Sequence, residues 1–143
     1  MPMSIWFNKV TVDEINDRAK GTLSDHLGIK FIEIGDDRLV ASMPIDPKTT
    51  QPMRIMHGGA SSALAETVAS AAGNYCVDQK QFVCVGLDIN INHLKPVSAG
   101  EVKAIAKPYH LGKSTQVWEI KIYNREKTLI SIGRLTLAVL KRK

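Results

Sequence analysis

The stretch HGGASSALAETVASAAGNYC, residues 57–76, decides how this chain of 143 residues folds. Small and apolar side chains fill it, and Glu66 is its single carboxylate. Four apolar residues recur at the i, i+4, i+7 and i+11 spacing of one helical stripe: Leu64, Val68, Ala71 and Tyr75. At about 100° per residue, Glu66 falls on the opposite side of the helix, together with Ser62, Ser70 and Gly73. The pattern predicts a helix buried on both sides, with one carboxylate on its small-residue side.

Glu66 is an unusual side chain for a buried helix, because burying an ionised carboxylate is costly unless it is paired or hydrogen-bonded. One explanation is structural: the side chain reaches a solvated edge or an arginine. The other is chemical. Gly58 and Gly59 leave backbone N–H groups free at the positive end of the helix dipole, where they can polarise a carbonyl oxygen. Because a carboxylate two turns further along can activate water or attack the carbonyl carbon, the pattern favours cleavage of an ester or thioester.

Length and composition indicate one soluble domain. The chain is long enough to bury a real core, and its 44% hydrophobic and 23% charged residues are ordinary for a globular protein. The net charge of +5 is modest, and the terminal KRK supplies three of the positive charges. The other basic residues are scattered instead of lying on one face with aromatic residues between them, which argues against a nucleic-acid partner. An anionic small molecule is the partner that this charge suits.

The sequence shows no sign of export, a metal site or a membrane span. Cys76 and Cys84 lack the spacing of metal ligands, and the N-terminus lacks a charged segment followed by an apolar core. We therefore expect reduced thiols in a cytoplasmic protein that binds no metal. The most apolar stretch, residues 57–76, is interrupted by Glu66, Asn74 and several serines, so we expect no membrane partner.

Ahead of the central helix, the sequence predicts a helical lead-in over residues 1–26. Thr11 and Glu14 have the spacing of a capping box, which marks the start of a short surface helix. Gly21 is a suitable end for that helix. A second short turn follows within residues 23–29.

Alternating apolar and polar residues predict an antiparallel sheet. Residues 29–34 and 39–45 alternate on either side of Gly35-Asp36-Asp37, which is typical of a β-hairpin. Four more strand patterns with short connections follow the central helix: residues 82–94, 102–109, 114–123 and 129–140. In the first of them we expect one face to hold these apolar side chains: Val83, Val85, Leu87, Ile89 and Ile91. Since short connections favour antiparallel neighbours, the predicted fold is α+β, a hairpin and a four-stranded meander around one central helix.

This order of elements resembles the hotdog-fold acyl-CoA thioesterases. The resemblance runs from about Leu27 to Leu140 within one domain, residues 1–143, and rests on these stretches: IGDDRLVASMPID, KTTQP, HGGASSALAETVAS, VGLDININH and KPYHLGKSTQVWEI. It is strongest to the thioesterases for 1,4-dihydroxy-2-naphthoyl-CoA, an intermediate of menaquinone biosynthesis, and to the proofreading thioesterases of enterobactin synthesis. It implies hydrolysis of an aromatic or related acyl-CoA to the free acid and CoA, without a cofactor.

The resemblance also implies roles near the start of the central helix. Glu66 matches the catalytic carboxylate, acting as nucleophile or as general base on water. The backbone N–H of Gly58, with Gly59 beside it, matches the donor to the thioester carbonyl. Gln51 matches a polar residue that positions the thioester or the attacking water, and His57 matches a hydrogen-bonding neighbour of the carbonyl. From the residues alone, His57 can instead be the N-cap of the helix.

Two further residues match the site of the family. Ser70, one turn beyond Glu66, matches a residue that assists the carboxylate, and His93 matches one that lines the pocket near the acyl group. Both have simpler explanations. A serine in mid-helix often hydrogen-bonds to its own backbone, and a histidine in phase with the apolar face of its strand can be a satisfied core residue.

Coenzyme A phosphates require lysine or arginine side chains and free N–H groups. The candidates are Lys95, Lys107, His110, Gly112, Lys113 and Ser114. Any one of these lysines can simply be exposed on a hairpin. The glycine turn around Lys113 is the better candidate, because backbone and side chains can converge there.

Hotdog proteins assemble at least as dimers whose sheets join edge to edge and so cover an exposed strand. The resemblance implies a homo-oligomer, a dimer of dimers, in which Glu66 of one subunit meets loop residues of its neighbour. Two rival functions stay open. A hotdog hydratase or dehydratase also pairs a histidine with an acidic residue, although the His-Gly-Gly entrance favours hydrolysis. A non-catalytic acyl-CoA-binding sensor usually carries a DNA-binding module, for which we see no room in this chain.

Overall fold

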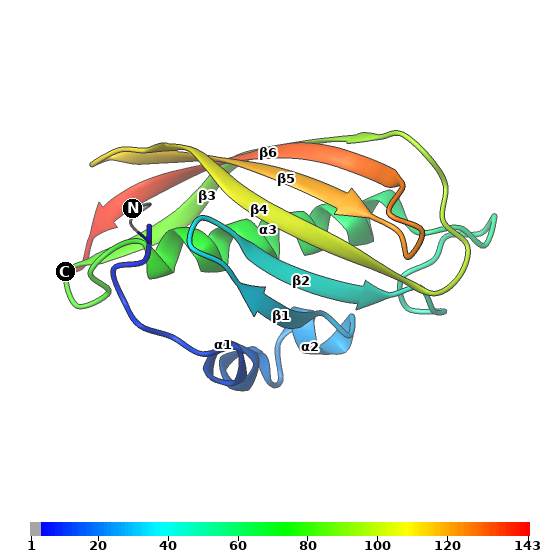
Figure 1. Cartoon of the computed structure of the whole chain (residues 1–143), viewed down its shortest axis with the longest axis horizontal. Coiled ribbons are helices and arrows are strands. Elements are labelled where there is room, and N and C mark those ends of the chain that lie inside the picture. Colours follow the sequence, from blue (N-terminus) through cyan, green and yellow to red (C-terminus); the bar gives the residue numbers. More distant parts are fainter. Residues whose placement is uncertain (1–3) are drawn as a thin grey trace.

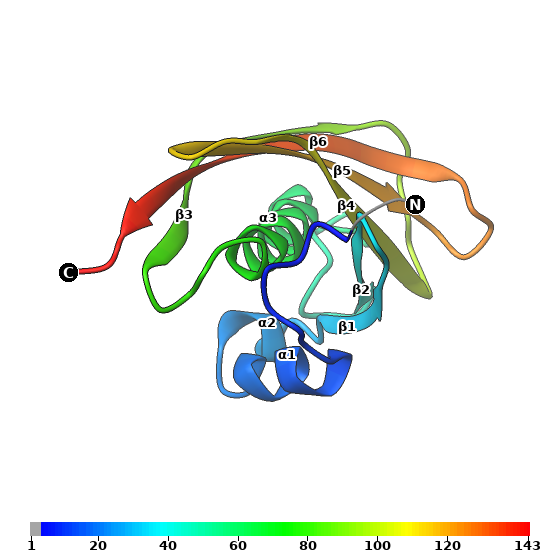
Figure 2. The same cartoon turned by 60° about the vertical axis from the view of Figure 1, so that its left-hand side comes forward.

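A six-stranded antiparallel sheet curls around one long helix in the computed structural model, which describes residues 4–143. Figure 2 shows this helix, α3 (Gly58–Tyr75), lying in the concave side of the sheet, and Figure 1 shows part of the sheet passing above it. The elements are α1 (Val12–Ala19), α2 (Leu23–His26), β1 (Lys30–Ile34), β2 (Leu39–Pro44), α3 (Gly58–Tyr75), β3 (Phe82–His93), β4 (Glu101–Leu111), β5 (Thr115–Tyr123) and β6 (Leu129–Lys141). The expected α+β hotdog fold is confirmed.

The helical lead-in forms as the sequence predicts. The Thr11 hydroxyl accepts a hydrogen bond from the Glu14 N–H, and the Glu14 carboxylate accepts one from the Thr11 N–H, each at 3.2 Å. This capping box satisfies N–H groups that the first turn leaves without partners. Both α1 and α2 lie below the β1 edge of the sheet (Figure 2). Residues 1–3, the start of the expected lead-in, lie outside the described residues.

The pairing of the strands differs from the expected meander. β1 and β2 form the hairpin, and β4, β5 and β6 follow one another across the sheet. The sheet order is β1-β2-β4-β5-β6-β3, however, so β3 pairs with β6 and not with β4. The chain crosses between β3 and β4 through residues 94–100. β3 is therefore an edge strand, with one row of backbone N–H and C=O groups turned away from the sheet.

A β-bulge in β3 contradicts the expected apolar face. The register with β6 shifts between Gly86 and Asp88. Such an extra residue exchanges the two faces of the strand beyond it. Cys84, before the bulge, faces the core, as does Gly86, which lies against Glu66 and Leu135. The expected set divides into outward-facing Val83 and Val85, the bulged Leu87, and core-facing Ile89 and Ile91.

The core lies between α3 and the inner face of the sheet. Leu64 and Val68 of the predicted helical stripe are fully buried. In β5 the expected alternation is confirmed, with four inward side chains: Gln116, Trp118, Ile120 and Ile122. Among residues 4–143, no helix has both the length and the apolar character needed to cross a membrane.

Candidate active site

The start of α3 leaves one backbone donor free. His57 is the N-cap, and its Nδ1 atom accepts a hydrogen bond from the Gly59 N–H at 2.8 Å. The next two N–H groups, of Ala60 and Ser61, donate to the His57 carbonyl at 3.0 and 3.1 Å. Within residues 4–143, no group accepts a hydrogen bond from the Gly58 N–H. The N-cap explanation of His57 is therefore correct, and the donor that the cap leaves available is that of Gly58.

A cavity of about 430 Å³ lies beside Gly58. It brings together Gln51 from the loop before α3, Gly58 from α3 itself and His93 from the end of β3. Lys95 lines it as well. The remaining walls are mostly apolar: Ile55, Met56, Leu94, Pro96 and Val97, with Ser131. A few polar groups converging on a mostly apolar hollow are typical of a small-molecule site.

Gln51 is held in this cavity by a tight loop. Its backbone N–H donates to the Ile55 carbonyl at 3.0 Å, and its carbonyl accepts from the Arg54 N–H at 2.8 Å. Arg54 has a left-handed φ of +63°, which closes the turn. The side-chain oxygen of Gln51 accepts a hydrogen bond from the Met53 N–H. Because that oxygen is occupied by the loop, the NH₂ group of Gln51 is its free hydrogen-bonding group.

His93 lies over the first residue of α3. A Cβ atom on Gly58 would stand 2.9 Å from His93 Nε2, so the ring fills the space that a side chain at position 58 would need. The other ring nitrogen, Nδ1, lies 3.3 Å from Ser61 Oγ and 3.5 Å from Ser131 Oγ. His93 is exposed in this chain and lines the cavity, so the core-histidine explanation is wrong.

Glu66 lies apart from that cavity. It follows Gly58 by two turns, which is about 12 Å along the helix axis. Its half-buried carboxylate lies against Gly86 of β3, where a Cβ atom would stand 2.5 Å from Oε1. Among the described residues, none forms a hydrogen bond or ion pair with this carboxylate. No arginine within residues 4–143 therefore pairs with Glu66, and the structural explanation by an arginine does not hold for them.

Ser70 lies one turn beyond Glu66 on α3 and is half-buried. Its backbone carbonyl accepts a hydrogen bond from the Asn74 amide at 2.9 Å. Its hydroxyl forms no hydrogen bond within residues 4–143, so the backbone bond considered for this serine is not made here.

The predicted glycine turn lies at the opposite end of the molecule from the start of α3 (Figure 1). It is the β4–β5 hairpin, in which the Gly112 N–H donates to the Thr115 carbonyl at 2.9 Å and the His110 ring lies against Gly112. Gly112 and Lys113 border an apolar cavity of about 510 Å³. Lys107 is less suited to a phosphate, since its ammonium pairs with Asp37 at 3.8 Å.

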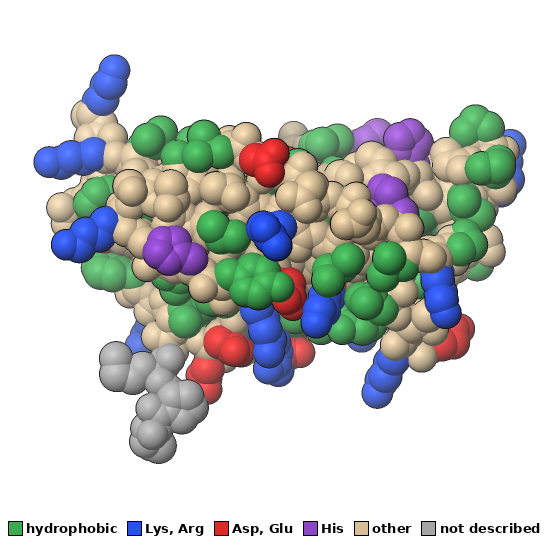
Figure 3. Space-filling model, turned by 90° about the horizontal axis from the view of Figure 1, so that it is seen from above, with side chains coloured by type: hydrophobic (Ala, Val, Ile, Leu, Met, Phe, Trp, Pro, Cys, Tyr) green, Lys and Arg blue, Asp and Glu red, His purple; other side chains and the backbone are tan. Residues whose placement is uncertain are grey.

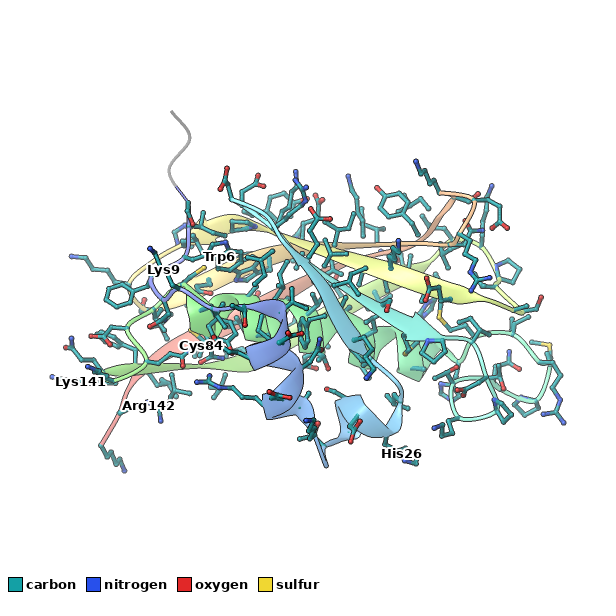
Figure 4. All side chains as sticks on the ribbon, turned by 60° about the horizontal axis from the view of Figure 1, so that its bottom comes forward. Trp6, Lys9, His26, Cys84, Lys141 and Arg142 are labelled. Carbon is teal, nitrogen blue, oxygen red and sulfur yellow. The ribbon has the colours of Figure 1, made fainter. Side chains whose placement is uncertain are left out.

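This end of the molecule is rich in positive charge. The candidate turn contributes Lys113, and Figure 4 shows Lys9, Lys141 and Arg142 toward the same end. Figure 3, which looks onto the outer face of the sheet, shows histidine side chains toward both ends of that face. The expected CoA residues are therefore divided between two places, Lys95 beside Gly58 and the hairpin at the far end.

Sequence reasoning missed three residues of this site. Gly86 had a signal, because an isolated glycine inside a strand pattern often marks a bulge or a close approach. Ser61 and Ser131 had none: each is fully buried, and each contributes only through its position behind His93.

Comparison with known proteins agrees with the fold. Residues 53–131 match the thioesterase superfamily. The 1,4-dihydroxy-2-naphthoyl-CoA hydrolase of Escherichia coli (strain K12) is 44% identical over 95% of this chain and 99% of its own. The proofreading thioesterase EntH of Cronobacter turicensis is 43% identical over 95% of this chain and 98% of its own.

Solved structures share the same architecture. Thioesterase PA1618 of Pseudomonas aeruginosa, crystallised with one glutamine replaced by alanine, is 41% identical and has a TM-score of 0.96 over 97% of this chain and 100% of its own. A Staphylococcus aureus protein crystallised with one glutamate replaced by alanine is 38% identical, with a TM-score of 0.81 over 84% of this chain and 99% of its own. The same S. aureus protein, described as a thioesterase, was also crystallised with one glutamine replaced by alanine.

Proposed function

The chain belongs to the thioesterase superfamily and is a thioester hydrolase, and from that premise we propose that it cleaves aromatic acyl-CoA into the free acid and CoA in the cytoplasm. The proposal rests on the free N–H of Gly58, which borders the same cavity as Gln51 and His93. A backbone donor at the positive end of a helix stabilises the negative charge that develops on a thioester oxygen.

The active site is shared by two subunits. Within one chain, Glu66 is about 12 Å along α3 from Gly58, and its carboxylate has no partner among the described residues. The free edge of β3, next to Glu66, is available to pair with β3 of a second copy. Antiparallel pairing of these edges reverses one subunit relative to the other, so that Glu66 of the partner subunit approaches Gly58. Two such dimers form the tetramer.

The sequence separation of two residues in a relative supports a joint role for Gln51 and Glu66 in the reaction. The two residues replaced in the S. aureus crystal structures, a glutamine and a glutamate, stand as far apart in that chain as Gln51 and Glu66 do in this one. Residues chosen for substitution to alanine in a thioesterase are those expected to matter for its reaction. Gln51 therefore offers its free NH₂ group to the substrate or to the attacking water.

The reaction needs no metal or organic cofactor. The substrate carbonyl oxygen accepts a hydrogen bond from the Gly58 N–H, which makes the carbonyl carbon more electrophilic. Glu66 of the partner subunit then attacks that carbon, or takes a proton from a water molecule that attacks it. When water attacks, the C–S bond breaks, the proton taken up by Glu66 passes to the CoA sulfur, and the acyl group leaves directly as the acid. When Glu66 attacks, the C–S bond breaks to give CoA, which takes up a proton from solvent, and a mixed anhydride on Glu66, which a water molecule then hydrolyses to the acid and the free carboxylate. Ser70, one turn further along α3, assists the carboxylate.

An aromatic acyl group suits the apolar walls of the cavity. Met56, Leu94 and Val97 line it, and its volume of about 430 Å³ is within the ordinary range for small-molecule sites. The E. coli relative is named for a naphthoyl-CoA substrate. The negatively charged nucleotide of CoA binds Lys95 or the hairpin around Lys113, which the partner subunit supplies.

Thiol release from a panel of acyl-CoAs tests this proposal. Wild-type protein is expected to hydrolyse aryl-CoAs, and Glu66→Ala to lose that activity by orders of magnitude with unchanged folding. Turnover that survives in Glu66→Ala would show that Glu66 is structural. Hydration of an enoyl-CoA without thiol release would replace the proposal with the hydratase function.

Mixing two inactive variants tests the shared site. Glu66→Ala and Gln51→Ala are refolded together, so that half of the dimers carry one subunit of each kind. Each mixed dimer then has one site with both substitutions and one with neither, which restores about a quarter of the wild-type activity. If both residues act within one subunit, every site keeps a substitution and the mixture stays inactive.

A further inference from the structure

His93 is fixed from both sides. Its Nε2 edge lies beside Gly58, where a Cβ atom would stand 2.9 Å away, and its Nδ1 edge faces Ser61 and Ser131. Ser131 is the direct cross-strand neighbour of His93 in the β3–β6 pair. The ring therefore has one nitrogen at the cavity and the other against hydroxyl groups of the interior.

The two serines cannot act on a substrate themselves. A serine oxygen 3.3 Å from a histidine nitrogen suggests a nucleophile and its base. Ser131 borders the cavity, but both Ser61 and Ser131 have a relative exposure of 0%, so no substrate carbon can reach their oxygens. Any effect that they have on the reaction must pass through His93.

The hydrogen bonds around the His93 ring indicate which of its two nitrogens carries the proton. The Ser61 hydroxyl donates to the Gly58 carbonyl at 2.9 Å, and the Ser62 hydroxyl donates to the same carbonyl at 2.9 Å. Among the described residues, the Ser131 hydroxyl has a single hydrogen-bonding neighbour, Nδ1 of His93, at 3.5 Å. A buried hydroxyl hydrogen without an acceptor is costly. It has one only when Nδ1 carries no proton. The Ser61 oxygen, 3.3 Å from Nδ1, could accept from a protonated Nδ1, but the Ser61 hydroxyl is already hydrogen-bonded through its donation to the Gly58 carbonyl. The balance of these contacts therefore favours the neutral ring with its proton on Nε2.

We propose that Ser131 is a positioning residue that holds His93 in the Nε2–H tautomer, so that the ring adds a second N–H donor beside the Gly58 N–H for the substrate carbonyl oxygen. This inference rests on the proposed function for its catalytic consequence, whereas the tautomer depends only on the residues around the ring. Two donors that converge on one oxygen form the arrangement that stabilises an oxyanion.

Nuclear magnetic resonance of the histidine ring nitrogens tests the tautomer directly. The protein is labelled with ¹⁵N in its histidines, and the signals of His93 are assigned by their loss in His93→Ala. The wild type is expected to show a protonated Nε2 and an unprotonated Nδ1. Ser131→Ala is expected to shift the ring toward the Nδ1–H tautomer. A wild-type ring protonated at Nδ1 alone overturns the proposal, even if the variant fails to fold.

Kinetics test the consequence for catalysis. Ser131→Ala is expected to lower kcat for an aryl-CoA by roughly 10- to 100-fold with little change in KM. Ser131→Thr, which keeps the hydroxyl, is expected to restore most of that loss. Because Ser131 acts through His93, the double variant Ser131→Ala/His93→Ala is expected to be no slower than His93→Ala alone.

Ser62→Ala is the matched control. Ser62 donates to the same Gly58 carbonyl as Ser61 but forms no hydrogen bond with His93. This variant is expected to keep both the tautomer and kcat. An equal loss of kcat in Ser62→Ala and Ser131→Ala, or additive effects of the Ser131 and His93 substitutions, would overturn the proposal. If the wild type releases thiol from no acyl-CoA, the proposed function fails, and the ring tautomer still decides whether Ser131 positions His93.

Discussion

The Oε1 atom of Glu66 lies 2.5 Å from the point where a Cβ atom on Gly86 would stand. Gly86 belongs to β3, at the position where the register with β6 shifts. The strand therefore makes room for the carboxylate by lacking a side chain at the residue opposite it. The carboxylate accordingly rests at the free edge of the sheet, where the proposed partner subunit joins.

Substitution Gly86→Ala is expected to displace the Glu66 carboxylate. Misplacing a reacting group by about 1 Å can cost on the order of 100-fold in rate, so we expect kcat to fall by roughly 10- to 100-fold. Stability should be preserved or rise by about 0.5 kcal/mol, because alanine in a strand interior is more favourable than glycine. Thiol-release kinetics and chemical denaturation measure the two effects.

Asp88→Ala is the control for that experiment. Asp88 lies in the same strand just beyond the bulge, is exposed, and pairs with Thr136 on the outer face. We expect its kcat to stay within about two-fold of the wild type, because Asp88 is an exposed side chain on the outer face and contacts neither the core nor Glu66. A Gly86→Ala enzyme with wild-type kcat would show that Glu66 does not need its present position.

Local signals in the sequence predict most elements of this fold. The Thr11–Glu14 capping box, the helix at residues 57–76 and the alternation around Trp118 each depend on residues close together in the chain, and each is confirmed. The place of β3 at the edge of the sheet could not be predicted in the same way. It depends on pairing with β6, more than thirty residues away, and the short connection to β4 favoured the wrong neighbour.

The candidate site was predictable only where its residues lie close together in the sequence. Gly58 and Glu66 lie on one helix, so their types and spacing suggested the chemistry. Ser131 could not be found from the sequence, because its importance arises only from lying across from His93 in the β3–β6 pair. The bulge at Leu87 was also missed, and it divides the strand into two segments with opposite inward phases.

Lys113 and Lys95 are expected to differ in their effects on CoA binding if only one of them contacts a phosphate. A hydrogen bond to a charged group contributes about 1.5–3 kcal/mol. Replacing the lysine that binds a CoA phosphate by alanine should therefore raise KM for an acyl-CoA by about 10-fold or more. The same variant should leave KM for the corresponding acyl-pantetheine unchanged, since that substrate lacks the nucleotide. Both lysine-to-alanine variants are compared on both substrates.

Lys80→Ala is the control for the lysine variants, because Lys80 is an exposed lysine in the turn before β3. Its removal lowers the net positive charge by the same amount. An equal rise in KM for all three variants would indicate general attraction of the anionic substrate and no defined phosphate contact.

The two cysteines are expected to make stability fall in alkaline solution. Burial raises the pKa of the Cys76 thiol from 9.0 to about 12, with the nearby Cys84 adding to the rise. Burial likewise raises the pKa of Cys84 from 9.0 to about 11. Below pH 9 both thiols keep their protons whether folded or unfolded. Above it the unfolded chain loses them first, so the free energy of unfolding falls as the pH rises toward 11 and 12.

Denaturation of the wild type and of Cys76→Ala/Cys84→Ala across this pH range measures the effect of the thiols. The variant is expected to lose less stability than the wild type between pH 9 and pH 11, because other groups that titrate there are common to both proteins. Thiol alkylation at about pH 8 should be slow in the folded protein and fast in denaturant. Rapid alkylation of the folded protein would contradict the burial of Cys84 and the partial burial of Cys76.

Gln116 and Trp118 are expected to stabilise the core as a pair. The Trp118 indole N–H donates to Gln116 Oε1 at 2.9 Å, and the Gln116 amide donates to the Gly73 carbonyl at 3.3 Å. Gln116→Leu would leave the buried Trp118 indole N–H without an acceptor, at a cost of about 1–3 kcal/mol, whereas the Gly73 carbonyl keeps the Cys76 N–H as a donor at 3.2 Å. Because Trp118→Phe removes that N–H, the double variant should lose less stability than the two single losses added together. Chemical denaturation of the four proteins measures the coupling.

Ile122→Val, further along β5, is the control, and its effect should add to that of Gln116→Leu without coupling. Strict additivity for the Gln116 and Trp118 pair would show that their hydrogen bond contributes nothing to stability.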